Sequence, residues 1–136
     1  MGEHIFDLII EKIKPGTTIP KILSKEIWKV KSCEGKRRGE EALIYEIPNH
    51  KNPKKPHQKG INATEWDRAY KQLLIEGEFT LEWFRGNMDK CSEEGNCNYY
   101  TIGSIFTLLG IAEYETRGLF INKMKTENRK QETKNA

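Results

Sequence analysis

The sequence predicts an α+β fold, with about four helices packed on one face of a small antiparallel sheet. Three observations support this prediction: an apolar stripe at helical spacing near the start, β-forming residues around a polar, glycine-flanked stretch, and helical spacing again after residue 60. The chain has 136 residues, the size of one ordinary domain. We therefore expect a single domain over residues 1–124.

A first helix is expected over residues 3–14. Its apolar side chains recur at i, i+1, i+4, i+5 and i+8 and form one stripe: Ile5, Phe6, Ile9, Ile10 and Ile13. Pro15 and Gly16 follow this stripe and are typical of the end of a helix.

A β-hairpin is expected next, with strands over residues 26–32 and 41–47 and a polar loop over residues 34–39. Because side chains alternate along a strand, Trp28 and Val30 share one face and Lys29 and Lys31 the other. Residues 48–60 contain prolines, histidines and lysines but no apolar aliphatic side chain to bury. We expect this segment to be a mobile connecting loop.

A second helix is expected from a capping box, in which Asn62 and Glu65 bond to each other's backbone, and it ends at Gly77. Thr80 should cap a shorter helix, and residues 89–98 read as a polar loop. Thr101 should cap a further helix, in which Gly103 and Gly110 allow close packing and which ends at Arg117 and Gly118.

The last ordered element is expected to be a short strand over residues 119–121, placed against the hairpin. Residues 125–136 are polar and offer no apolar anchor before the terminal alanine, so we expect a disordered tail. Together these elements give a sheet made of the hairpin and one C-terminal strand.

The cysteines and the apolar segments indicate a cytoplasmic protein. Cys33, Cys91 and Cys97 are an odd number of thiols in a chain large enough to fold without disulfides, which fits a reducing compartment. The apolar run near the N-terminus is too short for a secretion signal, and no window approaches the roughly 20 apolar residues of a membrane span. We expect no membrane partner.

The sequence predicts no catalytic constellation, metal or cofactor. Cys91 and Cys97 have five residues between them, a spacing that is wrong for a zinc ribbon, and neither has an adjacent histidine. Ser104 follows Gly103 without the second glycine of a hydrolase elbow, and no glycine-rich phosphate loop is present. We therefore lean towards a protein without enzymatic activity.

Charge is distributed unevenly along the chain. Residues 1–60 hold 13 Lys and Arg against 8 Asp and Glu, whereas residues 61–125 hold 7 against 10. Nine cations fall between residues 29 and 59: Lys29, Lys31, Lys36, Arg37, Arg38, Lys51, Lys54, Lys55 and Lys59. Such a surface can neutralise phosphates and release their counterions, which predicts non-specific nucleic-acid binding. The alternative is that these are ordinary solubilising side chains.

The order of helices after residue 60, followed by a β-wing, resembles winged-helix DNA-binding domains at the level of fold. The charges oppose that mode of binding, because the expected helices carry more carboxylates, such as Glu76, Glu78 and Glu82, than cations. We therefore assign the predicted binding to the hairpin and the loop after it.

Aromatic residues give a second functional hypothesis, a protein-interaction or self-association module that forms a homodimer. The candidates are Trp83, Tyr99 and Tyr100, since large aromatic side chains are common at the centres of interfaces. The alternative for these rings is a place in the core.

Overall fold

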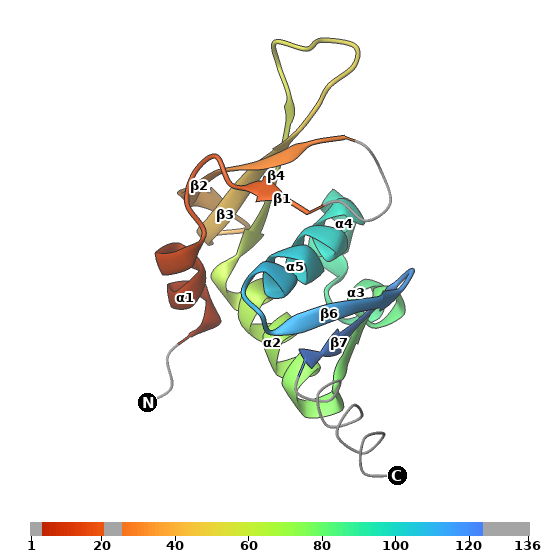
Figure 1. Cartoon of the computed structure of the whole chain (residues 1–136). Coiled ribbons are helices and arrows are strands. Elements are labelled where there is room, and N and C mark those ends of the chain that lie inside the picture. Colours follow the sequence, from red (N-terminus) through yellow and green to blue (C-terminus); the bar gives the residue numbers. More distant parts are fainter. Residues whose placement is uncertain (1–3, 21–25, 124–136) are drawn as a thin grey trace. The chain divides into compact units, whose positions relative to one another are not determined.

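A computed structural model describes residues 4–20 and 26–123 (Figure 1). The chain forms two compact units that divide between Asp67 and Arg68, and we call residues 1–67 unit 1 and residues 68–136 unit 2. The α+β class is confirmed, with five helices and two antiparallel sheets in the described part of the chain. The expected tail at residues 125–136 lies outside the described residues.

Unit 1 contains a short helix, a four-stranded antiparallel sheet and the start of α2 (Ala63–Glu76). The helix is α1 (Ile5–Lys12), and the strands, which lie in the order β1-β2-β3-β4, are β1 (Thr18–Ile19), β2 (Trp28–Arg37), β3 (Glu40–Ile47) and β4 (His57–Asn62). The apolar stripe expected for the first helix is buried at Ile5, Phe6, Ile9 and Ile13, but Ile10 is exposed.

The turn between β2 and β3 is tighter than the loop expected over residues 34–39. Residues 34–37 belong to β2, and Arg38 and Gly39 alone make the turn, with φ angles of 52° and 83°. Two successive residues with positive φ match the twist of antiparallel strands, which is why such two-residue turns are favoured in hairpins. Glycine adopts this conformation at little cost, whereas Arg38 must be held in it.

The segment 48–60, expected to be a loop, contains the start of a fourth strand. Residues 57–62 form β4, in which His57 is opposite Ile47 and Ile61 is opposite Leu43 in β3. Gly60 fits here because a Cβ atom would lie 2.7 Å from the Ile44 side chain and 3.2 Å from the Leu43 carbonyl oxygen. Pairing with β3 therefore outweighs the low strand propensity of this segment.

Unit 2 contains the rest of α2 and a three-stranded antiparallel sheet in the order β5-β7-β6. After α2 come β5 (Glu78–Thr80), α3 (Leu81–Asn87), α4 (Asp89–Glu94), α5 (Cys97–Leu108), β6 (Ala112–Thr116) and β7 (Leu119–Asn122). The strand expected at 119–121 is thus present, but its placement against the hairpin was wrong. It pairs with β6 through a tight turn at Gly118, and with β5.

Three other expectations for unit 2 were also wrong. Residues 89–94 form α4 rather than a loop, because Cys91 is buried and the Asn98 amide donates to the Cys91 carbonyl oxygen and to Glu94. The next helix begins at Cys97, so Thr101 lies buried inside α5 instead of capping it. Residues 112–116, expected to continue this helix, form β6.

An aromatic cluster makes the core of unit 2. The Tyr99 ring lies 4.8 Å from Phe79, 5.7 Å from Phe84 and 5.6 Å from Phe120, centroid to centroid. Its hydroxyl donates to the Phe79 carbonyl oxygen at 2.9 Å, and burial raises the pKa of Tyr99 well above its ordinary value. Gly103 lies against Phe120 with no room for a side chain, so the expectation of close packing is confirmed there. It is wrong for Gly110, which follows α5 with a φ of 76° and has nothing within 4 Å of an added Cβ atom.

Candidate functional site

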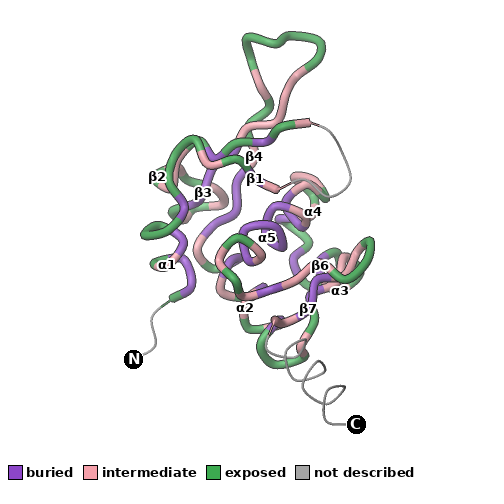
Figure 2. Tube along the Cα trace, in the orientation of Figure 1, coloured by how far each residue is buried: buried purple, intermediate pink, exposed green. Residues whose placement is uncertain are grey.

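The β3–β4 hairpin carries four of the nine cations predicted to bind nucleic acid. We call residues 48–59 the basic arm: they include four lysines, Lys51, Lys54, Lys55 and Lys59, and no carboxylate. In Figure 1 the hairpin extends from the sheet of unit 1, and Figure 2 shows its tip exposed. Lys51, Lys54 and Lys55 are exposed, whereas Lys59 lies within β4 and is half-buried.

The tip of the basic arm is closed by hydrogen bonds of its own. The Asn49 carboxamide oxygen accepts from the backbone N–H groups of Lys51 and Asn52, at 3.1 and 3.3 Å. The carboxamide nitrogen of Asn49 donates across the tip to the Lys55 carbonyl oxygen at 3.0 Å, and Lys55 N–H donates to Asn52. Such asparagine-centred turns fix a backbone without a hydrophobic core.

An ion pair joins the arm to the start of β2. Nε2 of His50 lies 2.7 Å from Oε1 of Glu26, and the histidine side chain is otherwise largely exposed. The contact carries opposite charges whenever the imidazole is protonated. It links residue 50 to a residue two positions before Trp28, the first residue of β2.

The cations of β2 stand in a different electrostatic setting. In the register of the sheet, Lys29 is opposite Glu46, Lys36 is opposite Glu41 and Arg37 is opposite Glu40. Directly opposed residues project from the same face with Cβ atoms about 5 Å apart, so a carboxylate stands beside each cation. Lys31 is exposed and lies at a register shift between Val30 and Ser32.

Arg38 is engaged inside unit 1. Its Nε and Nη2 atoms donate to the two carboxylate oxygens of Glu65 at 2.6 and 2.7 Å, and Nη2 also donates to the Gly60 carbonyl oxygen at 2.7 Å. Both side chains are mostly buried, with 20% and 12% of their surfaces exposed. This bidentate contact is the strong form of an arginine–carboxylate pair, and it gives Arg38 a structural role.

Eight of the nine predicted cations thus fall into two groups. Four lie on the basic arm, whose own residues include no acid, and four lie on β2 and its turn next to carboxylates from β3 or α2; Lys31 of β2 belongs to neither group. Charge counting along the sequence did not separate these groups. The available signal was Glu41 and Glu46 in the strand expected over residues 41–47, with Glu40 directly before it.

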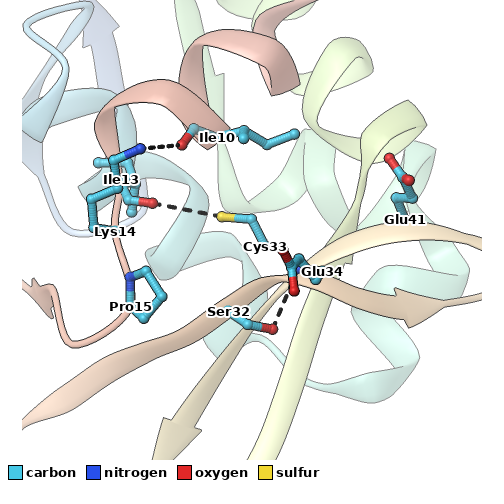
Figure 3. Close-up of a pocket in the computed structure, with 8 residues that line it drawn as sticks. All are labelled: Ile10, Ile13, Lys14, Pro15, Ser32, Cys33, Glu34 and Glu41. Carbon is cyan, nitrogen blue, oxygen red and sulfur yellow. Dashed lines mark hydrogen bonds between the residues drawn. The ribbon is translucent and has the colours of Figure 1, made fainter.

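A cavity of about 490 Å³ lies between the end of α1 and strands β2 and β3 (Figure 3). The Cys33 thiol points into it and donates to the Ile13 carbonyl oxygen at 3.7 Å. Burial raises the pKa of the Cys33 thiol above its ordinary value, which keeps it protonated at neutral pH and makes it a poor nucleophile. The ammonium group of Lys14, at the same cavity, donates to the Ile10 carbonyl oxygen.

The three aromatic residues proposed for an interface differ in exposure. Tyr99 is fully buried in the core of unit 2 and presents no surface to a partner. Trp83 and Tyr100 are half-buried and pack edge-on against core rings, Trp83 against Phe79 and Tyr100 against Tyr99.

The described residues contain no group of three or more His, Cys, Asp or Glu side chains arranged to hold a metal ion. Within residues 4–20 and 26–123, no helix has the length and apolarity needed to cross a bilayer. All three cysteines are free thiols. No protein-family model matches this chain, and no curated protein or solved structure is significantly similar to it.

Proposed function

We propose that this protein is a small cytoplasmic accessory protein that binds nucleic acid without sequence preference, through the basic arm. One observation carries the proposal: the twelve residues of the basic arm contain four lysines and no carboxylate, and three of the lysines, Lys51, Lys54 and Lys55, are exposed at the tip of the hairpin. Lysine ammonium groups are compact, strongly hydrated charges that pair with phosphates without reading bases.

The helix that a winged-helix mode of binding would use, α5, is less suited to phosphates than the basic arm. The order of elements in unit 2, a helix and a strand followed by three helices and a β-hairpin, resembles the winged-helix arrangement, in which α5 would enter the groove. However, α5 contains no Lys or Arg, and its residues from Asn98 to Phe106 are buried except for Tyr100. A helix with that surface cannot neutralise phosphates.

Binding by the basic arm has a defined salt dependence. Each phosphate that a lysine neutralises releases condensed counterions, so the logarithm of affinity falls linearly with the logarithm of salt concentration, by about 0.9 per contact on B-DNA. Three exposed lysines at the tip, Lys51, Lys54 and Lys55, allow about three such contacts from the arm itself. Affinity should therefore fall steeply as salt is added, for every sequence alike.

The test compares two double variants that remove the same charge. K54A/K55A takes two exposed lysines from the tip, and K29A/K36A takes two exposed lysines of β2 that stand opposite Glu46 and Glu41. We expect K54A/K55A to weaken oligonucleotide binding about tenfold at low salt and to lower the salt slope by about 2. K29A/K36A should change affinity by less than about twofold.

Fluorescence anisotropy with a labelled oligonucleotide, measured at several salt concentrations, gives both quantities. If the two variants lose the same amount of affinity, the oligonucleotide binds the whole cationic surface, which contradicts the role of the arm. A wild-type protein that does not bind, or binds independently of salt, would end the proposal.

A second candidate function is self-association of unit 2, which is supported by exposed aliphatic side chains on α2. Ile75 is 76% exposed and its neighbour Leu74 is 47% exposed, near half-buried Trp83 in sequence. Exposed apolar side chains of this kind are typical of contact surfaces. If copies associate through them, I75E should shift the protein from dimer to monomer in sedimentation velocity, and a concentration-independent wild-type monomer would exclude this function.

A further inference from the structure

The aromatic residues of unit 1 limit which form of nucleic acid the basic arm can hold. Residues 1–67 contain four of them, Phe6, Trp28, Tyr45 and Trp66, and all four are buried. Trp28 and Tyr45 stack on each other at 5.9 Å, and the Trp66 indole nitrogen donates to the Ile61 carbonyl oxygen. The arm itself has no Phe, Trp or Tyr.

Proteins that hold single strands combine a cationic groove with exposed aromatic rings, because each unstacked base needs a ring on which to stack. Unit 1 offers the cations without the rings. Its lysines can therefore gain energy from phosphates but cannot replace the stacking energy that bases lose when a strand is opened or held apart.

The shape of the arm fits a duplex. The arm is the tip of the β3–β4 hairpin: Ile47 is opposite His57 in the last pair of the two strands, and residues 48–56 form the turn that the Asn49 hydrogen bonds close. A hairpin tip made of two adjacent chain segments is narrow enough for the major groove of B-form DNA, which is about 12 Å wide and has phosphates along both edges. The lysines lie on both sides of the tip, Lys51 after β3 and Lys54, Lys55 and Lys59 towards and within β4.

We infer that the ligand of the basic arm is double-stranded nucleic acid, held through its phosphates while its bases remain stacked. A duplex also presents the denser charge, about one phosphate per 1.7 Å of axis. This inference rests on the proposed function and specifies its substrate.

The experiment uses one mixed 20-mer of DNA, its complement and the annealed duplex, each titrated with the full chain at the same salt concentration. We expect the duplex to bind about tenfold more tightly than either single strand. K54A/K55A should reduce that preference, because it weakens the duplex complex most.

The two proposals fail differently. Single strands that bind as tightly as the duplex, or more tightly, overturn the inference while leaving nucleic-acid binding in place. If none of the three oligonucleotides binds, the proposed function itself is wrong.

Discussion

Replacing Gly103 with alanine is expected to lower the free energy of unfolding by about 3 kcal/mol, at the upper end for an overpacked core. A Cβ atom at this position would overlap the Phe120 ring at Cε2, far inside van der Waals contact. The ring cannot move aside easily, because it is fully buried between Tyr99 and Tyr114. The gain in helix propensity, about 1 kcal/mol at most, does not offset this clash. Thermal denaturation followed by circular dichroism measures the effect.

Gly86 provides the matched control. It lies in α3 with nothing within 4 Å of an added Cβ atom, so G86A should leave stability unchanged or raise it by up to about 1 kcal/mol. A second variant identifies the cause, because F120L removes the ring with which the methyl group introduced by G103A would clash. The double variant G103A/F120L should lose less free energy of unfolding than the sum of the losses in the two single variants. Additive losses, or a G103A protein as stable as the wild type, would contradict the account of this contact.

Replacing Glu65 with alanine is expected to cost about 3 kcal/mol, because removing one member of a largely buried ion pair leaves the other charge without compensation. The Glu65 carboxylate accepts two hydrogen bonds from Arg38 and one, at 2.9 Å, from the backbone N–H of Asn62. The variant therefore leaves the Arg38 guanidinium group without its carboxylate partner. Arg38 also has a positive φ of 52° in the turn. Chemical denaturation monitored by the fluorescence of Trp28 and Trp66, both in unit 1, reports the loss.

Glu40 serves as the comparison for this variant. Its carboxylate accepts a 2.6 Å hydrogen bond from the Thr64 hydroxyl at an exposed site, so E40A should cost less than about 1 kcal/mol. The double variant R38M/E65Q tests the electrostatic cause, since the glutamine can still accept from Asn62 and no buried charge remains. It should be more stable than E65A alone. If it is less stable, the packing of the arginine stem rather than its charge holds this site.

Sequence reasoning succeeded where the signal was local. The capping box is present in full: Asn62 N–H donates to Glu65, and Glu65 N–H donates to the Asn62 carboxamide oxygen, both at 2.9 Å. The two residues are three apart in one helical turn, so their meeting depends on α2 alone. Gly103 follows the same logic, since a glycine in an otherwise apolar helix indicates that another group approaches closely.

Reasoning failed where distant segments decide the outcome. Nothing near residues 57–60 predicts a strand, and only the register with β3 makes them one. The strand at 119–121 could pair with any exposed edge, and the adjacent β6 and its turn determine its place. The Arg38–Glu65 pair spans 27 residues, so no spacing in the sequence indicates it.

The same limit applies to the candidate site. A count of charges found nine cations in one stretch, but the strand pairing that sets Glu40, Glu41 and Glu46 beside three of them is a property of the sheet. Of the two groups of cations, only the basic arm remains strongly positive as the count of charges predicted, since its own twelve residues contain no acid.

The Asn49 turn carries a consequence for how the proposed complex would form. A tip already folded by its own hydrogen bonds loses little conformational entropy when a ligand arrives, so less binding energy is consumed in ordering it. Encounter would then be governed by diffusion and long-range electrostatic attraction. Added salt should then lower the association rate constant by a larger factor than it raises the dissociation rate constant.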